Sequence, residues 1–216
     1  MRILLAGQKR FGRDTLALLL RLGHDLAAVC CPVQPEPDKL WIAAANAGLP
    51  VIPSGTLSAE IMPAGVDLII AAHSHDFIGR KTRARSRIGA LGYHPSLLPL
   101  HRGRDAIRWA VHMRERVTGG TCYWMTDDVD AGPVAAQDWC FIRPEDDARS
   151  LWSRELAPMG LRLFERVLGD LAARRIVCIP QEAALSTWEP AFDGAPRLYR
   201  PELPQIGNDG FERVVT

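Results

Sequence analysis

Short apolar runs alternate with segments of helical periodicity through the first half of this chain, and this alternation constrains its fold more than any other feature. We expect strands at 2–6, 26–31, 51–52, 66–72 and 88–93. Apolar residues recur at helical spacing in the intervening segments 11–22 and 39–47. Strands that alternate with helices form a parallel sheet whose faces are covered by helices. The sequence therefore predicts an α/β fold with a doubly wound, mainly parallel sheet.

The second half predicts further helices and two more strands. Helical segments are expected at 78–87 and 103–117, and strands rich in aromatic and β-branched residues at 121–125 and 134–142. A long helix follows Asp146 or Asp147, with an interruption at Pro158. From Ser186 onward the chain is rich in proline and glycine and has no periodicity. We expect one domain over 1–183 and an extended C-terminal arm over 184–216 that lies on it.

Composition narrows the class of protein. The 216 residues are 47% hydrophobic and 24% charged, as in an ordinary single-domain protein. A net charge of +1 offers no electrostatic attraction for nucleic acid or membrane, and no apolar run approaches the roughly 20 residues of a membrane span. The five cysteines contain no C-x-x-C pair, which favours reduced thiols in a cytoplasmic protein.

A histidine stands where the strand at 88–93 ends. It begins the string His94-Pro-Ser-Leu-Leu-Pro, which Arg102-Gly103 follows, and Asp130-Ala-Gly comes later in the chain. Ligands of open α/β sheets bind at the carboxyl ends of strands. An imidazole has an ordinary pKa of about 6.5 and both accepts and donates protons near neutral pH, and a nearby carboxylate favours its charged form. His94 is therefore a candidate proton-transfer group, and Asp130 supplies a carboxylate later in the chain.

These two blocks resemble the active-site signature of the folate-dependent formyltransferase family, HPSLLP-x-x-RG followed by D-[AT]-G. The string from Tyr93 to Pro99 is most similar to the hydrolase domain of formyltetrahydrofolate dehydrogenase. The resemblance implies a Rossmann-like formyltransferase fold and an enzyme that moves a formyl group from 10-formyltetrahydrofolate to the amine of a small acceptor. It assigns proton transfer to His94, and it assigns to Asp130 the task of orienting the His94 ring and favouring its charged form. Ser96 either orients His94 or starts the loop through its hydroxyl.

The resemblance also places the two substrates. The pterin ring of the donor is expected between segments 72–78 and 126–130, and the donor-binding candidates are Asp76, Phe77, Ile78, Ala90 and Asp128. The acceptor is expected to meet Gln8, Lys9 and Arg102, although Arg102 is interpreted mainly as structural. For Phe77 and Ile78, a packing role at the start of a helix is an equal alternative to donor contact. For Lys9, a solvated surface position is an equal alternative to acceptor contact. His73, His75 and Asp76 are residue types that bind metals, but we expect no metal here.

Position 92 departs from the family pattern. Many family transferases have asparagine two residues before the histidine, where its amide stabilises the oxyanion, and this chain has Gly92. Glycine offers no side-chain donor, so a protonated His94 would carry more of that role. We also expect the space beside Gly92 to admit water, which would release formate in the absence of an acceptor.

Two other functions stay open at this point. One is a hydrolase that releases formate from 10-formyltetrahydrofolate, which the missing asparagine favours. The other is a noncatalytic folate-binding module, against which the intact His94–Asp130 pair counts. The chain has no basic extension for tRNA, so a small amine is the expected partner, without nucleic acid or membrane. A homodimer is compatible with the sequence.

Overall fold

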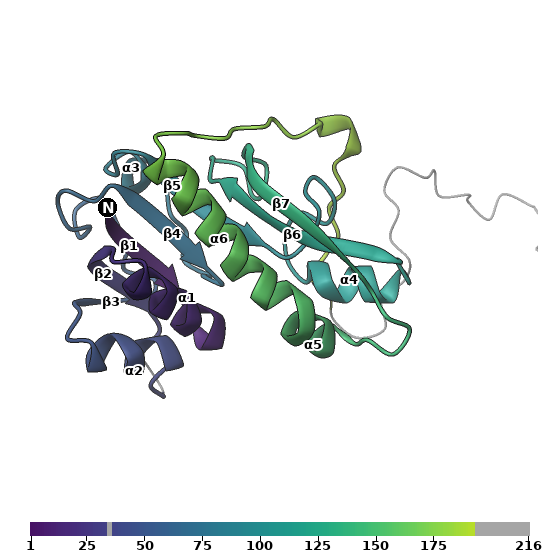
Figure 1. Ribbon diagram of the computed structural model, residues 1–216, viewed down its shortest axis with the longest axis horizontal. Helices are drawn as coiled ribbons and strands as arrows, with labels where there is room; N and C mark the ends of the chain where they lie inside the picture. The colour runs from purple at the N-terminus through teal and green to yellow at the C-terminus, as the bar shows by residue number, and fades with distance from the viewer. Residues whose placement is uncertain (34–35, 193–216) are drawn as a thin grey trace, which may run out of the picture.

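A single seven-stranded sheet forms the centre of the protein (Figure 1). The computed structural model describes residues 1–33 and 36–192. The strand order is β3-β2-β1-β4-β5-β6-β7; the first five named are mutually parallel, and β6 is antiparallel to both β5 and β7. The strands are β1 Arg2–Gly7, β2 Asp25–Cys31, β3 Val51–Pro53, β4 Leu68–Ala72, β5 Gly89–His94, β6 Val117–Trp124 and β7 Val134–Phe141. The predicted α/β fold with a mainly parallel sheet is confirmed.

Helices pack on one face of this sheet around a large apolar core. Phe11, Leu40 and Phe164 show how α1, α2 and α6 contribute to it. A smaller core on the opposite face joins Leu4 and Ile69 to the loop residues Leu57, Met62 and Ile78. The helices are α1 Lys9–Arg21, α2 Lys39–Asn46, α3 Arg80–Arg83, α4 Ala106–His112, α5 Ala148–Leu151, a π-helical turn Trp152–Leu156 and α6 Ala157–Ala172. None of the described helices is long and apolar enough to cross a membrane.

Two predicted helices are much shorter than the sequence indicated. The segment 78–87 contains only α3, because the Ser86 hydroxyl donates to the carbonyls of Arg83 and Gly89 and closes a turn there. The segment 103–117 contains only α4, which ends where Arg114 adopts a left-handed φ of 55°. Strand β6 then begins at Val117 rather than at 121, since its first residues pair with the far end of β7.

The interruption expected at Pro158 is a π-helical turn. Trp152–Leu156 forms this wide turn, and Pro158, which has no N–H, is the second residue of α6. The Tyr93 hydroxyl donates to the carbonyl oxygen of Leu156 at 2.6 Å. Since Tyr93 is on β5 directly before His94, this bond fixes the last residues of β5 against the start of α6.

The segment after α6 runs back over the sheet toward α4 (Figure 1). Ile179 exchanges two backbone hydrogen bonds with Val134, and Trp188 forms a bridge with Arg102. The Trp109 indole on α4 donates to the carbonyl of Pro190 at 2.8 Å. Residues 184–192 of the expected arm therefore lie on the sheet domain, and 193–216 lie outside the described residues.

Candidate active site

His94 ends β5 with its imidazole enclosed by protein. Its side chain is 9% exposed, and its Nε2 donates to the backbone oxygen of His101 at 2.6 Å. Its Nδ1 lies 3.5 Å from Oδ2 of Asp130. A carbonyl oxygen only accepts hydrogen bonds, so Nε2 carries a proton whenever this bond is formed. Proton exchange is left to Nδ1, the nitrogen that faces the carboxylate.

Asp130 is held at both carboxylate oxygens. Oδ1 accepts the Tyr123 hydroxyl at 2.6 Å, and Oδ2 accepts the Gly103 N–H at 2.8 Å. The residue adopts a left-handed φ of 52°, which turns the loop after β6 back toward His94. At Gly132 a Cβ would stand 1.6 Å from the carbonyl oxygen of Trp124. The Asp-Ala-Gly motif therefore combines a charged group with a turn that only glycine accommodates.

The loop from Pro95 to Gly103 is braced internally. The Ser96 hydroxyl donates to the Leu100 carbonyl at 2.6 Å, and the Thr121 hydroxyl on β6 donates to the Ser96 carbonyl at 2.7 Å. Ser96 is buried. These contacts correspond to the loop-forming alternative for Ser96, and a direct catalytic role for this hydroxyl stays a prediction.

Gln181 joins the two motif blocks, and the sequence analysis did not identify it. Its Oε1 accepts Nε and Nη2 of Arg102 at 3.1 and 2.7 Å. Its Nε2 donates to the carbonyl of Asp130 at 2.8 Å and to that of Gly132 at 2.7 Å. The Arg102 guanidinium is thus engaged within the protein, as its structural interpretation expected, and its contact with an acceptor stays a prediction.

His101 is a second residue that the sequence analysis missed. Its ring is buried between the carboxylates of Glu115, 2.9 Å from Nε2, and Glu189, 3.0 Å from Nδ1. Burial alone would lower the pKa of His101, but the hydrogen bonds and charges of both glutamates outweigh it and raise that pKa to about 9. His101 is therefore charged at neutral pH, and it ties the loop that receives His94 Nε2 to the segment containing Glu189.

The two segments expected to enclose the donor lie next to each other. The Arg83 guanidinium donates both to the carbonyl of Ile78 and to the carboxylate of Asp127, and so joins 72–78 to 126–130. Phe77 leaves 82% of its surface exposed, whereas Ile78 is buried in the smaller core. Ala90 is buried on β5 and Asp128 is exposed in the second segment.

Asp76 has structural partners in the same region. Its carboxylate accepts the Ser54 hydroxyl at 2.8 Å and the backbone N–H of Gly55, which ties the loop after β4 to the turn after β3. The backbone N–H of Asp76 itself donates to the Ser74 hydroxyl. These bonds account for an aspartate at this position without a ligand, and its contact with the donor stays a prediction.

Gln8 and Lys9 follow β1, which lies beside β4 at the point where the strand order reverses. Such a reversal is where open α/β sheets bind ligands. Gln8 is 9% exposed, and within residues 1–33 and 36–192 its Nε2 has no hydrogen-bond partner. The Lys9 backbone N–H donates to the Asp38 carboxylate at 2.8 Å, and the Lys9 side chain is exposed. An amide donor is thus available at the expected acceptor end.

The two histidines after β4 are neighbours. His73 adopts a left-handed φ of 58°, and the ring centroids of His73 and His75 are 5.7 Å apart. Burial, followed by the charges of Lys9 and His75, lowers the pKa of His73 to about 4, so this ring is neutral near pH 7. In the part of the chain that the structure describes, no group of three or more metal-binding side chains comes together.

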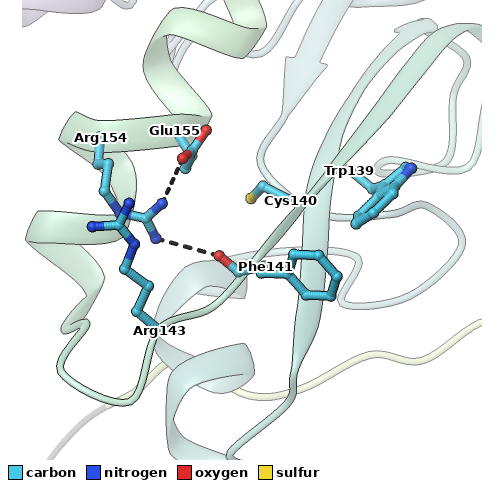
Figure 2. Close-up of a pocket in the computed structure, with 6 residues that line it drawn as sticks. All are labelled: Trp139, Cys140, Phe141, Arg143, Arg154 and Glu155. Carbon is cyan, nitrogen blue, oxygen red and sulfur yellow. Dashed lines mark hydrogen bonds and ion pairs between the residues drawn. The ribbon is translucent and has the colours of Figure 1, made fainter.

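A separate hollow lies at the outer strand of the sheet. It measures about 360 Å³ and is lined by Trp139, Cys140, Phe141, Arg143, Arg154 and Glu155. In Figure 2, Arg154 reaches the Phe141 carbonyl and the Glu155 carboxylate on one side of this hollow, and Trp139 stands on the other. None of the residues expected at the active site contributes to it.

The sequence matches a known family of proteins. The family model described as formyl transferase matches residues 54–167, a range that contains both motif blocks. This chain belongs to the formyl transferase family. It is 30% identical to mitochondrial 10-formyltetrahydrofolate dehydrogenase of Mus musculus over 88% of the chain, which corresponds to 22% of that protein. It is also 30% identical to methionyl-tRNA formyltransferase of Lactobacillus delbrueckii, over 89% of the chain and 65% of that protein.

Solved structures of the family share the fold. A glycinamide ribonucleotide transformylase from Symbiobacterium toebii superimposes with a TM-score of 0.70 at 22% identity, over 83% of this chain and 94% of that one. An N-formyltransferase from Helicobacter canadensis, solved with folinic acid and dTDP-3-aminofucose, gives 0.72 at 18% identity over 87% and 70%. HypX from Aquifex aeolicus, solved with tetrahydrofolic acid, gives 0.68 at 22% identity over 89% and 30%.

The charged state of His101 should stabilise the fold. In the unfolded chain a histidine has its ordinary pKa of 6.5, and in the folded protein the pKa of His101 is about 9. A raised pKa contributes stability that is complete below the unfolded value and is lost as pH rises through the folded one. We expect the free energy of unfolding to fall by roughly 2 kcal/mol between about pH 6 and about pH 10.

Urea denaturation at both pH values measures this loss. The variant His101→Gln should show a smaller loss than the wild type, while His24→Gln, which leaves this cluster intact, should behave like the wild type. An equal loss in the wild type and His101→Gln would contradict the assigned role.

Proposed function

We propose that this chain transfers the formyl group of 10-formyltetrahydrofolate to the amine of a small acceptor. The observation that carries the proposal is the His94–Asp130 pair, with 3.5 Å between Nδ1 and Oδ2, at the carboxyl end of a central strand. Membership in the formyl transferase family supports the same chemistry. The whole pair would be unnecessary in a noncatalytic folate-binding module.

Proton transfer at Nδ1 of His94 meets the needs of this reaction. The acceptor amine forms a bond to the formyl carbon and loses a proton, and the bond from that carbon to the donor nitrogen breaks as the donor nitrogen gains one. Negative charge develops on the formyl oxygen in between. A protonated Nδ1 stabilises that charge, and the neutral ring accepts a proton. Asp130 favours the charged ring through its carboxylate.

The donor is assigned to the side of the site bounded by segments 72–78 and 126–130. Exposed Phe77 offers an aromatic surface for a pterin ring. Exposed Asp128 offers a carboxylate for amino groups of that ring. Two relatives of known structure contain tetrahydrofolic acid and folinic acid, which supports a folate as the donor.

The acceptor is assigned to the end of β1. The buried Nε2 of Gln8 lacks a partner among the described residues and would donate to an oxygen of the acceptor. Exposed Lys9 would add a positive charge beside it. One solved relative is named as a glycinamide ribonucleotide transformylase, and another is an N-formyltransferase solved with dTDP-3-aminofucose. Both names point to small amine acceptors, which favours a small acceptor here over tRNA. Dimerisation and a cytoplasmic location stay predictions.

Hydrolysis of the same donor is the second candidate. Position 92 is glycine and so lacks the asparagine of many family transferases. Curated relatives that align over 88% of the chain are 10-formyltetrahydrofolate dehydrogenases. Incubation with 10-formyltetrahydrofolate and a set of amines separates the two functions. Mass spectrometry detects a formylated amine after transfer and free formate after hydrolysis, and intact donor in every reaction would refute both.

We expect His94→Ala to abolish formyl loss from the donor and to keep folate binding. The imidazole moves protons, whereas the assigned donor contacts lie in the two flanking segments. The rate should fall by roughly 10²- to 10⁴-fold. Turnover assays and fluorescence titration with folinic acid measure the two quantities, with His24→Ala as the control. Wild-type turnover by His94→Ala would exclude the assigned role.

We expect Asp130→Asn to lower turnover with little change in folding. The substitution keeps the size of the side chain and removes the charge that stabilises protonated His94. The pH–rate profile should therefore lose activity at a lower pH than the wild type does. Asp138→Asn, on the exposed side of β7, is the matched control. An unchanged rate and profile would mean that Asp130 only shapes its turn.

A further inference from the structure

We propose that Tyr123 takes the place left by the missing side chain at position 92 and positions the Asp130 carboxylate toward His94. The inference rests on the proposed function and adds a positioning residue to it. Three observations support it: the register of β5 and β6, the packing above Gly92, and the hydrogen bond from the Tyr123 hydroxyl.

Gly92 and Tyr123 are direct partners in the antiparallel pairing of β5 with β6. A Cβ at position 92 would meet three atoms of the tyrosine, namely Cε1 at 2.9 Å, Cζ at 3.0 Å and the hydroxyl oxygen at 3.1 Å. The ring therefore fills the place of a side chain at 92. The expectation that Gly92 leaves space for water is wrong, because an aromatic residue from the neighbouring strand occupies it.

The tyrosine hydroxyl is directed at the catalytic carboxylate. It donates to Oδ1 of Asp130 at 2.6 Å, while the other oxygen, Oδ2, faces His94 Nδ1. Tyr123 is 7% exposed, and its burial, together with the charge of Asp130, raises its pKa well above 10. The hydroxyl therefore keeps its proton throughout the working pH range and remains a donor to Asp130.

This arrangement assigns separate tasks to the three residues. A tyrosine hydroxyl has one proton to donate, and here it points at Asp130, so this hydroxyl donates no hydrogen bond to the formyl oxygen. Stabilisation of charge on that oxygen then depends on His94. Tyr123 controls how the Asp130 carboxylate is oriented toward His94. Tyr123 acts through Asp130 and does not replace the amide of an asparagine chemically.

Glycine at 92 and tyrosine at 123 are consequently coupled. A β-carbon at 92 would displace the ring and with it the hydroxyl that holds Asp130. Loss of the ring would free that space but would leave one oxygen of Asp130 without its donor. Each residue requires the other, and neither substitution alone preserves the geometry.

The decisive variant is Tyr123→Phe, which keeps the ring and removes the hydroxyl. We expect kcat to fall by about 10- to 100-fold, the loss of a hydrogen bond to a charged group, with KM for 10-formyltetrahydrofolate unchanged. The acid limb of the pH–rate profile should move to higher pH, because Asp130 is protonated more easily without its donor. The control is Thr15→Val on α1, which removes a buried hydroxyl bonded to the Phe11 carbonyl instead and should keep the kcat and profile of the wild type.

Histidine NMR tests the same claim without turnover. Tyr123→Phe should change the pH midpoint at which the His94 ring titrates, and Thr15→Val should not. Thermal melting adds the packing test: Gly92→Ala should lower Tm in the wild type and have little effect in a Tyr123→Ala background. Unchanged His94 titration in Tyr123→Phe would overturn the inference, even if the wild type proves inactive and the proposed function fails. Additive effects of the two alanine substitutions on Tm would overturn the coupling.

Discussion

The rest of the site depends on the contacts that hold the carboxylate of Asp130. Two donors fix it, the hydroxyl of Tyr123 and the backbone N–H of Gly103, and its Oδ2 faces His94. One donor comes from β6 and the other from the loop after β5. The carboxylate therefore joins two chain segments whose order along the chain is all that the family motif specifies. It also faces Nδ1 of His94, the nitrogen that is free to exchange protons.

Support for this carboxylate comes from distant parts of the chain. Gln181, after the last long helix, bonds to the carbonyl of Asp130 and to the side chain of Arg102. His101 provides the carbonyl that fixes Nε2 of His94, and the carboxylates of Glu115 and Glu189 hold its own ring. The segment after α6 thus contributes to the geometry of the site through hydrogen bonds and charge, and Glu189 does so from within the expected arm.

Local patterns predicted the sheet and the strand that ends at His94, because apolar runs are visible in short stretches of sequence. The partnership of His94 with Asp130 was implied by the resemblance to a known family. Gln181 and Glu189 were missed because their partners lie far away in the chain and no periodicity marks them. Tyr123 was missed because its role depends on strand register, which places it opposite Gly92. The helix expected at 103–117 is shortened to α4, because Arg114 adopts a left-handed φ of 55° just after its end.

The protonation of His94 tests the central claim most directly. If the bond to the His101 carbonyl holds Nε2 as a donor, only Nδ1 exchanges protons with the substrates. Nitrogen-15 NMR of histidine-labelled protein, with His94 assigned from the His94→Ala spectrum, distinguishes the two tautomers of the neutral ring. The account predicts a neutral His94 with its proton on Nε2 and a free Nδ1. A neutral ring with its proton on Nδ1 would contradict it.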